Sequence, residues 1–156
     1  MTLLWPVAAV LVLAGAVSVL RRRYVVVTVT GMSMVPAFRH DDRVLVRRLD
    51  GHRCRTGDVV VLQAPQEDGW RHPPSPRGPW NLKRVAAVAG EPVPDVAARA
   101  CGQPAGSPVP AGRVVVIGDA PGSYDSRAWG FLPADRVLGV VVRRMARLGR
   151  DSVGTR

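Results

Sequence analysis

Two residues in this chain could act together in catalysis, one as a hydroxyl nucleophile and the other as an amine base. Ser33 lies between two methionines in a turn that contains glycine, and Lys83 is the only lysine among 22 Lys and Arg side chains. A lysine amine can lose its proton when it is removed from water, whereas an arginine guanidinium stays protonated in proteins. Taken alone, however, a serine in such a turn is most often a turn residue, and a strand lysine is most often exposed.

The sequence lacks the motifs of other common chemistries. Its three histidines, His40, His52 and His72, do not stand in an order that suggests a histidine-based triad. No HExxH, P-loop or GxGxxG motif occurs, and neither Cys54 nor Cys101 belongs to a CxxC pair. We therefore expect no metal and no cofactor. The two cysteines could form one disulfide in an extracytoplasmic domain, or remain free thiols.

The segments that must position Ser33 and Lys83 have the pattern of a strand-and-turn fold. Valine is abundant, aromatic residues make up 5% of the chain, and 16 Gly and 14 Pro punctuate it. Ser33 follows the first predicted strand, and Lys83 lies within the fourth. The strands are predicted at 25–30, 44–46, 59–62, 82–88, 114–117 and 138–142. This pattern favours a mostly β domain built from coiled antiparallel sheets or a small open barrel.

An apolar segment precedes this domain. Residues 3–20 carry no charge and are followed by Arg21, Arg22 and Arg23. As a helix, the run would be about 27 Å long, close to the hydrocarbon thickness of a bilayer. We therefore expect residues 1–23 to form one transmembrane anchor with a basic flank. A cleaved signal peptide would need basic residues before the apolar run, and a buried helix would carry an apolar stripe rather than apolar residues all round.

The rest of the chain divides into a β domain at 24–144 and a basic, flexible tail at 145–156. Two stretches rich in proline, 64–80 and 91–112, are predicted to be loops within the β domain. The net charge of +10 fits an anionic membrane surface better than nucleic acid, because three arginines adjoin the apolar segment and no nucleic-acid-binding motif is visible.

Five sequence boxes, in the expected order, resemble those of type I signal peptidases, which are S26-family serine proteases with a Ser/Lys dyad. They cover most of residues 28–144. One departure is Asp41, which stands where the family usually has glycine. Another is the segment 120–122, where the family usually has an asparagine after Gly-Asp. The boxes are Gly31–Pro36 (G-x-S-M-x-P in the family), Asp42–Val46, Gly57–Val61, Lys83–Val85 and Gly118–Gly130.

The resemblance implies a catalytic role for a few of these residues. Ser33 would be the nucleophile, Lys83 the general base, and Ser123 the residue that orients the lysine amine. The backbone N–H of Ser33 would donate to the oxyanion. Gly31 occupies the position where some members carry a second hydroxyl donor, so a backbone or water donor must serve there.

The resemblance also implies residues that shape the site and bind the substrate. Asp125 and Arg127 would form an ion pair that shapes the site, and Gly118 and Asp119 would also shape it. The family binds an extended peptide along a sheet edge, with small side chains in shallow pockets. The candidates to line these pockets are Val29 and Met34.

Together these features predict a membrane-bound serine endopeptidase that removes signal or leader peptides from secreted precursors. Its expected partners are a precursor substrate and membrane lipid, with no nucleic acid. The resemblance places the catalytic domain outside the cytoplasm, whereas Arg21, Arg22 and Arg23 favour a cytoplasmic flank. Two alternatives remain: a dedicated maturation protease of the same family for one precursor, and a non-catalytic basic protein that binds membrane surfaces.

Overall fold

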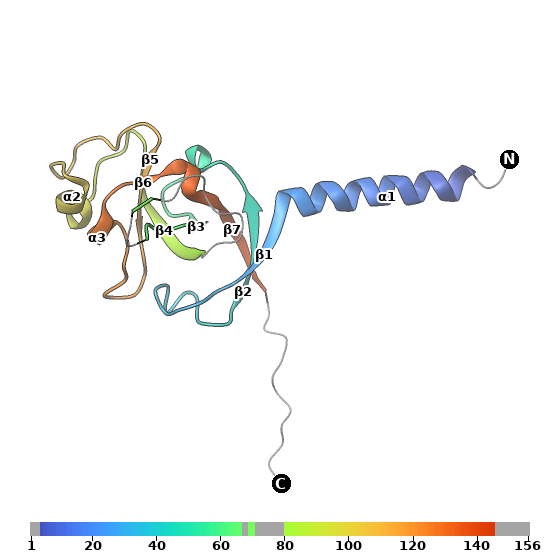
Figure 1. The fold of residues 1–156 in the computed structure, drawn as a ribbon, viewed down its shortest axis with the longest axis horizontal. Coiled ribbons are helices and arrows are strands. Elements are labelled where there is room, and N and C mark those ends of the chain that lie inside the picture. Colours follow the sequence, from blue (N-terminus) through green and yellow to red (C-terminus); the bar gives the residue numbers. More distant parts are fainter. Residues whose placement is uncertain (1–3, 67–68, 71–79, 146–156) are drawn as a thin grey trace, which may run out of the picture.

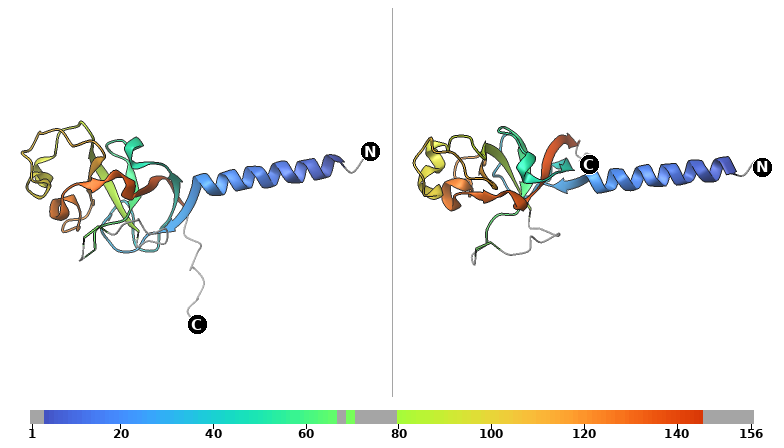
Figure 2. Two further views of the ribbon diagram at one scale, coloured as in Figure 1. Left: turned by 45° about the horizontal axis from the view of Figure 1, so that its top comes forward. Right: turned by 90° about the horizontal axis from the view of Figure 1, so that it is seen from above.

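The computed structural model describes residues 4–66, 69–70 and 80–145. It consists of an N-terminal helix, α1 (Leu4–Arg23), and a β domain that begins at the next residue. The helix projects away from the domain in all three views (Figures 1 and 2). The predicted loop at 64–80 and the predicted tail at 145–156 lie largely outside the described residues.

Helix α1 corrects the prediction of a transmembrane anchor. None of the helices in the described part of the chain combines the length and the apolar character that crossing a membrane requires. The arginines Arg21, Arg22 and Arg23, expected to flank the anchor, instead form the last turn of the helix itself. The helix is therefore confirmed, but its role as a membrane span is not.

The β domain is a single antiparallel sheet of seven strands, which confirms the prediction of a mostly β fold. The strands follow the order β1-β2-β7-β3-β4-β5-β6, and the sheet curls into an open half-barrel (Figure 1). Strand β1 lies at one edge, and its outer side pairs with no other strand of the sheet as the structure describes it. The strands are β1 (Tyr24–Thr28), β2 (Arg43–Arg48), β3 (Val59–Leu62), β4 (Asn81–Val88), β5 (Arg113–Ile117), β6 (Leu132–Pro133) and β7 (Val137–Met145).

Short helices cover the connections between strands. A seven-residue helix, α2 (Asp95–Cys101), lies within the stretch 91–112, which was predicted to be a loop. It packs Ala97 against β4 and β5, so a few small side chains stabilise it where composition indicated only a proline-rich loop. The others are α3 (Ser126–Trp129) and the 3-10 helices η1 (Gly51–Arg53) and η2 (Ala134–Arg136).

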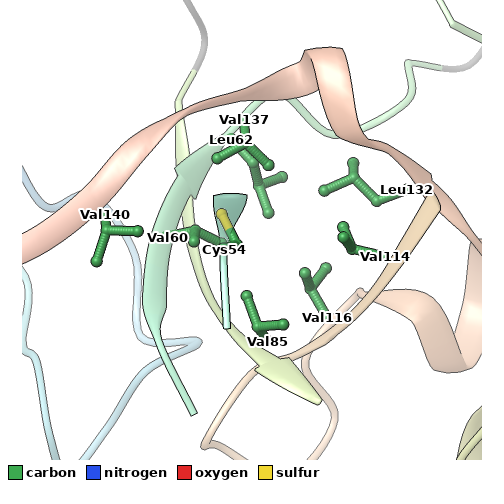
Figure 3. Close-up of a cluster of buried hydrophobic side chains, with 9 residues drawn as sticks. All are labelled: Cys54, Val60, Leu62, Val85, Val114, Val116, Leu132, Val137 and Val140. Atoms are coloured by element: carbon green, nitrogen blue, oxygen red, sulfur yellow. The ribbon is translucent and has the colours of Figure 1, made fainter. Parts of the chain in front are cut away.

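Alternating side chains of the strands build clusters on the two faces of the sheet. On one face, valine and leucine side chains from five strands point toward one another around Cys54 (Figure 3). On the other face, Val44 and Val46 of β2 are fully buried with Val61 and Leu82. Cys54 and Cys101 are both free thiols, and burial raises the pKa of Cys54 to about 11.

Asp41 occupies the turn before β2 and has a left-handed backbone, with φ at 67°, unlike any other non-glycine residue that the structure describes. Its N–H donates to the carbonyl of Val29 at 3.0 Å, which fixes this conformation. Only glycine adopts this left-handed conformation without steric cost, which explains why glycine is usual at this position in the type I signal peptidases that the sequence resembles.

We expect the side chain at position 41 to affect stability through this backbone conformation. Asp41→Val should lower the free energy of unfolding by about 1–2 kcal/mol, because a β-branched side chain clashes in the left-handed region. Asp41→Gly should not lower it. Urea unfolding measures both variants. Equal stability of the valine and glycine variants would contradict this account.

Candidate active site

Strand β4 places Lys83 in the interior of the protein. The strand pairs with β3 on one side and β5 on the other, and Lys83 lies opposite Val60. Only 2% of the lysine residue is exposed. Its Nζ donates a hydrogen bond to Ser123 Oγ at 2.6 Å. The chain's only lysine is thus buried within an apolar strand, although a strand lysine is most often exposed.

The surroundings of Lys83 favour its neutral form. Burial lowers the pKa of the amine below its ordinary value of 10.5, because the charged form loses its hydration. The negative charge of Asp125 raises the pKa, and the positive charge of Arg127 lowers it again. An amine with a lowered pKa loses its proton more readily, which is what a general base requires.

Gly118 brings the turn of Ser33 and the side chain of Ser123 to the same place. A Cβ atom added at Gly118 would lie 2.7 Å from the Ser33 carbonyl oxygen and would overlap Ser123 Oγ. The Ser33 carbonyl also accepts a hydrogen bond from the N–H of Ala120 at 3.0 Å. Ser33 itself is half-buried in the turn after β1. The backbone of this turn therefore lies against the Ser123 side chain that Lys83 contacts.

Asp125 and Arg127 form the predicted ion pair, and the pair is tightly built. Two guanidinium nitrogens of Arg127 donate to the two carboxylate oxygens at 2.9 and 2.7 Å. The carboxylate is fully buried and also accepts the N–H of Gly118 at 2.8 Å. Although burial alone would raise the pKa of Asp125, hydrogen bonds from Arg127, Gly118 and the Ser123 side chain hold it below its ordinary value. The carboxylate is therefore ionised at neutral pH.

A second Arg–Asp pair, which the sequence did not lead us to expect, involves the residue that follows Lys83 on β4. Arg84 follows Lys83 on β4, and its guanidinium donates to both oxygens of Asp119 at 2.9 and 2.7 Å. It also donates to the carbonyl of Gly57 at 3.2 Å. The pair ties β4 to the loop that carries Gly118 and Ser123. The neighbouring dipeptides Lys83-Arg84 and Gly118-Asp119 were the only sequence signal for it.

The remaining predicted site residues lie near the turn of Ser33 but differ in exposure. Gly31 is exposed, with φ at 91°, and its N–H donates to Nδ1 of His40 at 3.2 Å. Val29 and Met34 are 3% and 1% exposed and belong to the core cluster around Val44 and Val46. Their side chains thus lie beneath the surface, and whether a substrate reaches them remains a prediction.

A groove of about 320 Å³ follows the free edge of β1 toward the turn of Ser33. Its lining comes from the edge strand β1 and the turn after it, the end of β2, the residue before β4, and β7. A free strand edge with adjacent hollows is the arrangement that binds an extended peptide by adding it as a further strand. The lining residues are Val25, Val26, Val27, Thr28, Thr30, Arg48, Trp80 and Leu138.

The two opposing charges near Lys83 lead to a prediction about pH dependence. In Arg127→Gln, the buried carboxylate of Asp125 loses its counter-ion and favours the ammonium form of Lys83, so the pKa of Lys83 rises. Less neutral amine is then present at pH 7, and the acid limb of the pH profile of kcat/KM should move to higher pH. Peptide cleavage measured from pH 6 to 11 would show the shift.

Arg84→Gln is the matched control for this prediction. It removes an equally well-formed pair with an aspartate, whereas the charges that shift the pKa of Lys83 are those of Asp125 and Arg127. The acid limb of the pH profile of kcat/KM should therefore be the same in Arg84→Gln as in the wild type. If the acid limb shifted equally in Arg127→Gln and Arg84→Gln, the shift would come from loss of structure and not from loss of the positive charge of Arg127.

Comparison with known proteins relates most of the chain to one family. A family model described as "Signal peptidase, peptidase S26" matches residues 3–99 and 94–146. A protein named "Signal peptidase I" from Leptolyngbya laminosa is 32% identical over 137 residues, which cover 76% of this chain and 66% of the relative. The matched part thus spans just under two-thirds of that relative's length.

Proposed function

The chain belongs to the peptidase S26 signal peptidase family, and we propose that it is a serine endopeptidase that removes signal or leader peptides with a Ser33/Lys83 dyad. The observation that carries the proposal is the buried amine of Lys83, hydrogen-bonded to Ser123 beside the turn of Ser33. Few other roles account for a lysine that is kept out of water, because burial of an ammonium group is costly.

The hydrogen bonds of Ser123 indicate which way the lysine lone pair points. Lys83 Nζ donates to Ser123 Oγ at 2.6 Å, and interaction with the Ser123 side chain helps to hold the pKa of Asp125 below its ordinary value. The oxygen of Ser123 therefore serves as an acceptor for the lysine amine. A neutral amine has two N–H bonds and one lone pair. With one N–H directed to Ser123, the lone pair remains available for the hydroxyl of Ser33.

The proposed reaction has two steps. The hydroxyl of Ser33 attacks the scissile carbonyl while Lys83 Nζ takes its proton, and the backbone N–H of Ser33 donates to the developing oxyanion. Lys83 then gives the proton to the leaving amine, and an ester to Ser33 remains. A water molecule then attacks that ester while Lys83 takes its proton, and Lys83 returns the proton to the Ser33 oxygen as the ester bond breaks. The signal or leader peptide leaves with a new carboxyl group. Ser123 keeps the amine directed throughout, and Asp125 and Arg127 hold Ser123.

The groove along β1 is where we expect the precursor to bind. A peptide in extended conformation would pair with the free edge of β1, and its side chains would enter the hollows between β1 and Trp80. Residues just before the cut would lie near Thr30 and the Ser33 turn. Val29 and Met34, buried beneath them, would limit the depth of the pockets and so favour small side chains.

We also propose that the chain meets its precursors at a membrane. Proteins of this family are typically membrane-associated. Leu11, Leu13 and Leu20 on α1 are 67%, 66% and 62% exposed. Apolar side chains exposed together in this way favour contact with lipid acyl chains.

A precursor panel tests the proposed function. The purified chain, in detergent, is incubated with secretory precursors that carry small residues before the cut, and mass spectrometry locates each cleavage. We expect cleavage after a small residue, absent when Ser33→Ala replaces the wild type. Cleavage of many precursors would indicate a general signal peptidase, and cleavage of one a dedicated maturation protease. No cleavage of any precursor, with the protein folded, would contradict the proposal.

A further inference from the structure

Arg48 stands out among the residues that line the groove along β1. It is the only charged residue in the described lining of that groove, where its neighbours are valine, threonine, leucine and tryptophan side chains. It lies at the end of β2 and is exposed. Within the described part of the chain, no ion pair or hydrogen bond is found for its guanidinium. A cation without a counter-ion therefore faces the place where the proposed function puts the peptide.

The strand pattern directs Arg48 to the groove face of the sheet. Side chains two residues apart on a strand share a face, so Arg48 lies on the same face as Val44 and Val46. These valines pack with Val25 and Val27 of β1, which line the groove. Arg47, one residue earlier, points to the opposite face and is not among the groove residues.

The pairing of β1 with β2 indicates how far Arg48 lies from the turn of Ser33 along the groove. Arg47 pairs with Tyr24, so Arg48 lies level with the start of β1. Ser33 follows the other end of the same strand. A peptide extended along β1 advances about 3.3 Å per residue, as the strand does. For a peptide that runs parallel to β1, with its scissile bond at Ser33, the residue beside Arg48 would be roughly five to eight positions before the cut.

We infer that Arg48 is a specificity-determining residue, which selects precursors that carry an acidic side chain about five to eight residues before the cut. This inference rests on the proposed function and narrows its substrate class. A guanidinium forms bidentate hydrogen bonds with a carboxylate, and the apolar walls of the groove strengthen that contact. A precursor with only apolar side chains at these positions would leave Arg48 unpaired. The arrangement thus favours a dedicated precursor over the apolar leaders of secreted proteins in general.

Paired peptide substrates test this inference. Each pair has Glu or Gln at one position, five to eight residues before the cut, and the full chain cleaves them in detergent. We expect the wild type to prefer Glu in one pair by about three- to tenfold in kcat/KM, mainly through KM. Arg48→Gln should abolish the preference, and 0.5 M salt, as an example of high ionic strength, should weaken it. Arg48→Glu should instead prefer a peptide with Lys at that position.

Arg47→Gln is the matched control, because it removes the neighbouring arginine on the opposite face and should keep the preference for Glu. Equal cleavage of Glu and Gln peptides by the wild type at all four positions would overturn the inference and leave the proposed function standing. No cleavage of either peptide would overturn both. Weaker binding of Arg48→Gln to phosphatidylglycerol vesicles, with an unchanged Glu preference, would assign the arginine to lipid headgroups and also overturn the inference.

Discussion

Ser33→Ala and Lys83→Arg should each lower kcat/KM for precursor cleavage by at least about 10²–10⁴-fold, and the double variant should lose no more than either single variant. Nucleophile and base act in one step, so removing one leaves the other without a function. Lys83→Arg is the more informative of the two. It retains the positive charge at this site but removes the ability to release a proton.

Folding must be separated from catalysis in this experiment, because an arginine that cannot lose its charge is costly at a position only 2% exposed. Lys83→Met provides the control, since it has a similar length and needs no hydration. We expect Lys83→Met to be as inactive as Lys83→Arg but to unfold at a temperature at least as high as the wild type. Steady-state kinetics of all variants measures the loss of catalysis, and thermal unfolding measures the loss of stability. Substantial activity in Lys83→Met would contradict the dyad.

Gly118→Ala should reduce kcat/KM by about 10²-fold or more, although it adds only one methyl group. The new Cβ would overlap Ser123 Oγ and lie 2.7 Å from the carbonyl oxygen of Ser33. The turn and the side chain cannot both keep their positions, and displacements of about 1 Å at a catalytic site cost roughly this much. The φ angle of Gly118 is not in the left-handed region, so close approach alone explains the glycine.

Gly122→Ala is the control for this substitution within the same loop. Its added Cβ meets no atom within 4 Å, but its φ of 73° imposes a backbone cost that Gly118→Ala does not. We therefore expect Gly122→Ala to affect stability more than cleavage, and Gly118→Ala to affect cleavage more than stability. Urea unfolding and peptide kinetics on both variants compare the two. Full activity of Gly118→Ala would show that Ser33 and Ser123 do not depend on this contact.

Part of the site could be predicted because its chemistry depends on residue types. A lone lysine among arginines, within an apolar strand, identified an amine that could lose its proton, although such a lysine is most often exposed, and the structure buries Lys83 in β4. Its hydrogen bond to Ser123 was expected from the resemblance to the family. No spacing rule joins these two residues, which are forty positions apart and meet only because β4 and β5 pair.

Other parts of the structure could not be predicted because they depend on three-dimensional contacts. The pair of Arg84 and Asp119 requires a loop to fold back onto β4, and the positions of the two residues beside Lys83 and Gly118 did not by themselves indicate that they pair. Helix α2 is short and depends on packing of Ala97 rather than on a long helical pattern. The membrane span was predicted from the apolar run alone, whereas the helix also includes three arginines.

The protonation state of Lys83 is the property on which the proposed mechanism depends most directly. Because the chain contains a single lysine, ¹³C labelling at lysine Cε gives one side-chain lysine signal, and its chemical shift can be followed by NMR from pH 6 to 12. We expect a midpoint clearly below 10.5, which moves upward in Arg127→Gln. A midpoint at or above 10.5 in the folded protein would contradict the assignment of Lys83 as the general base.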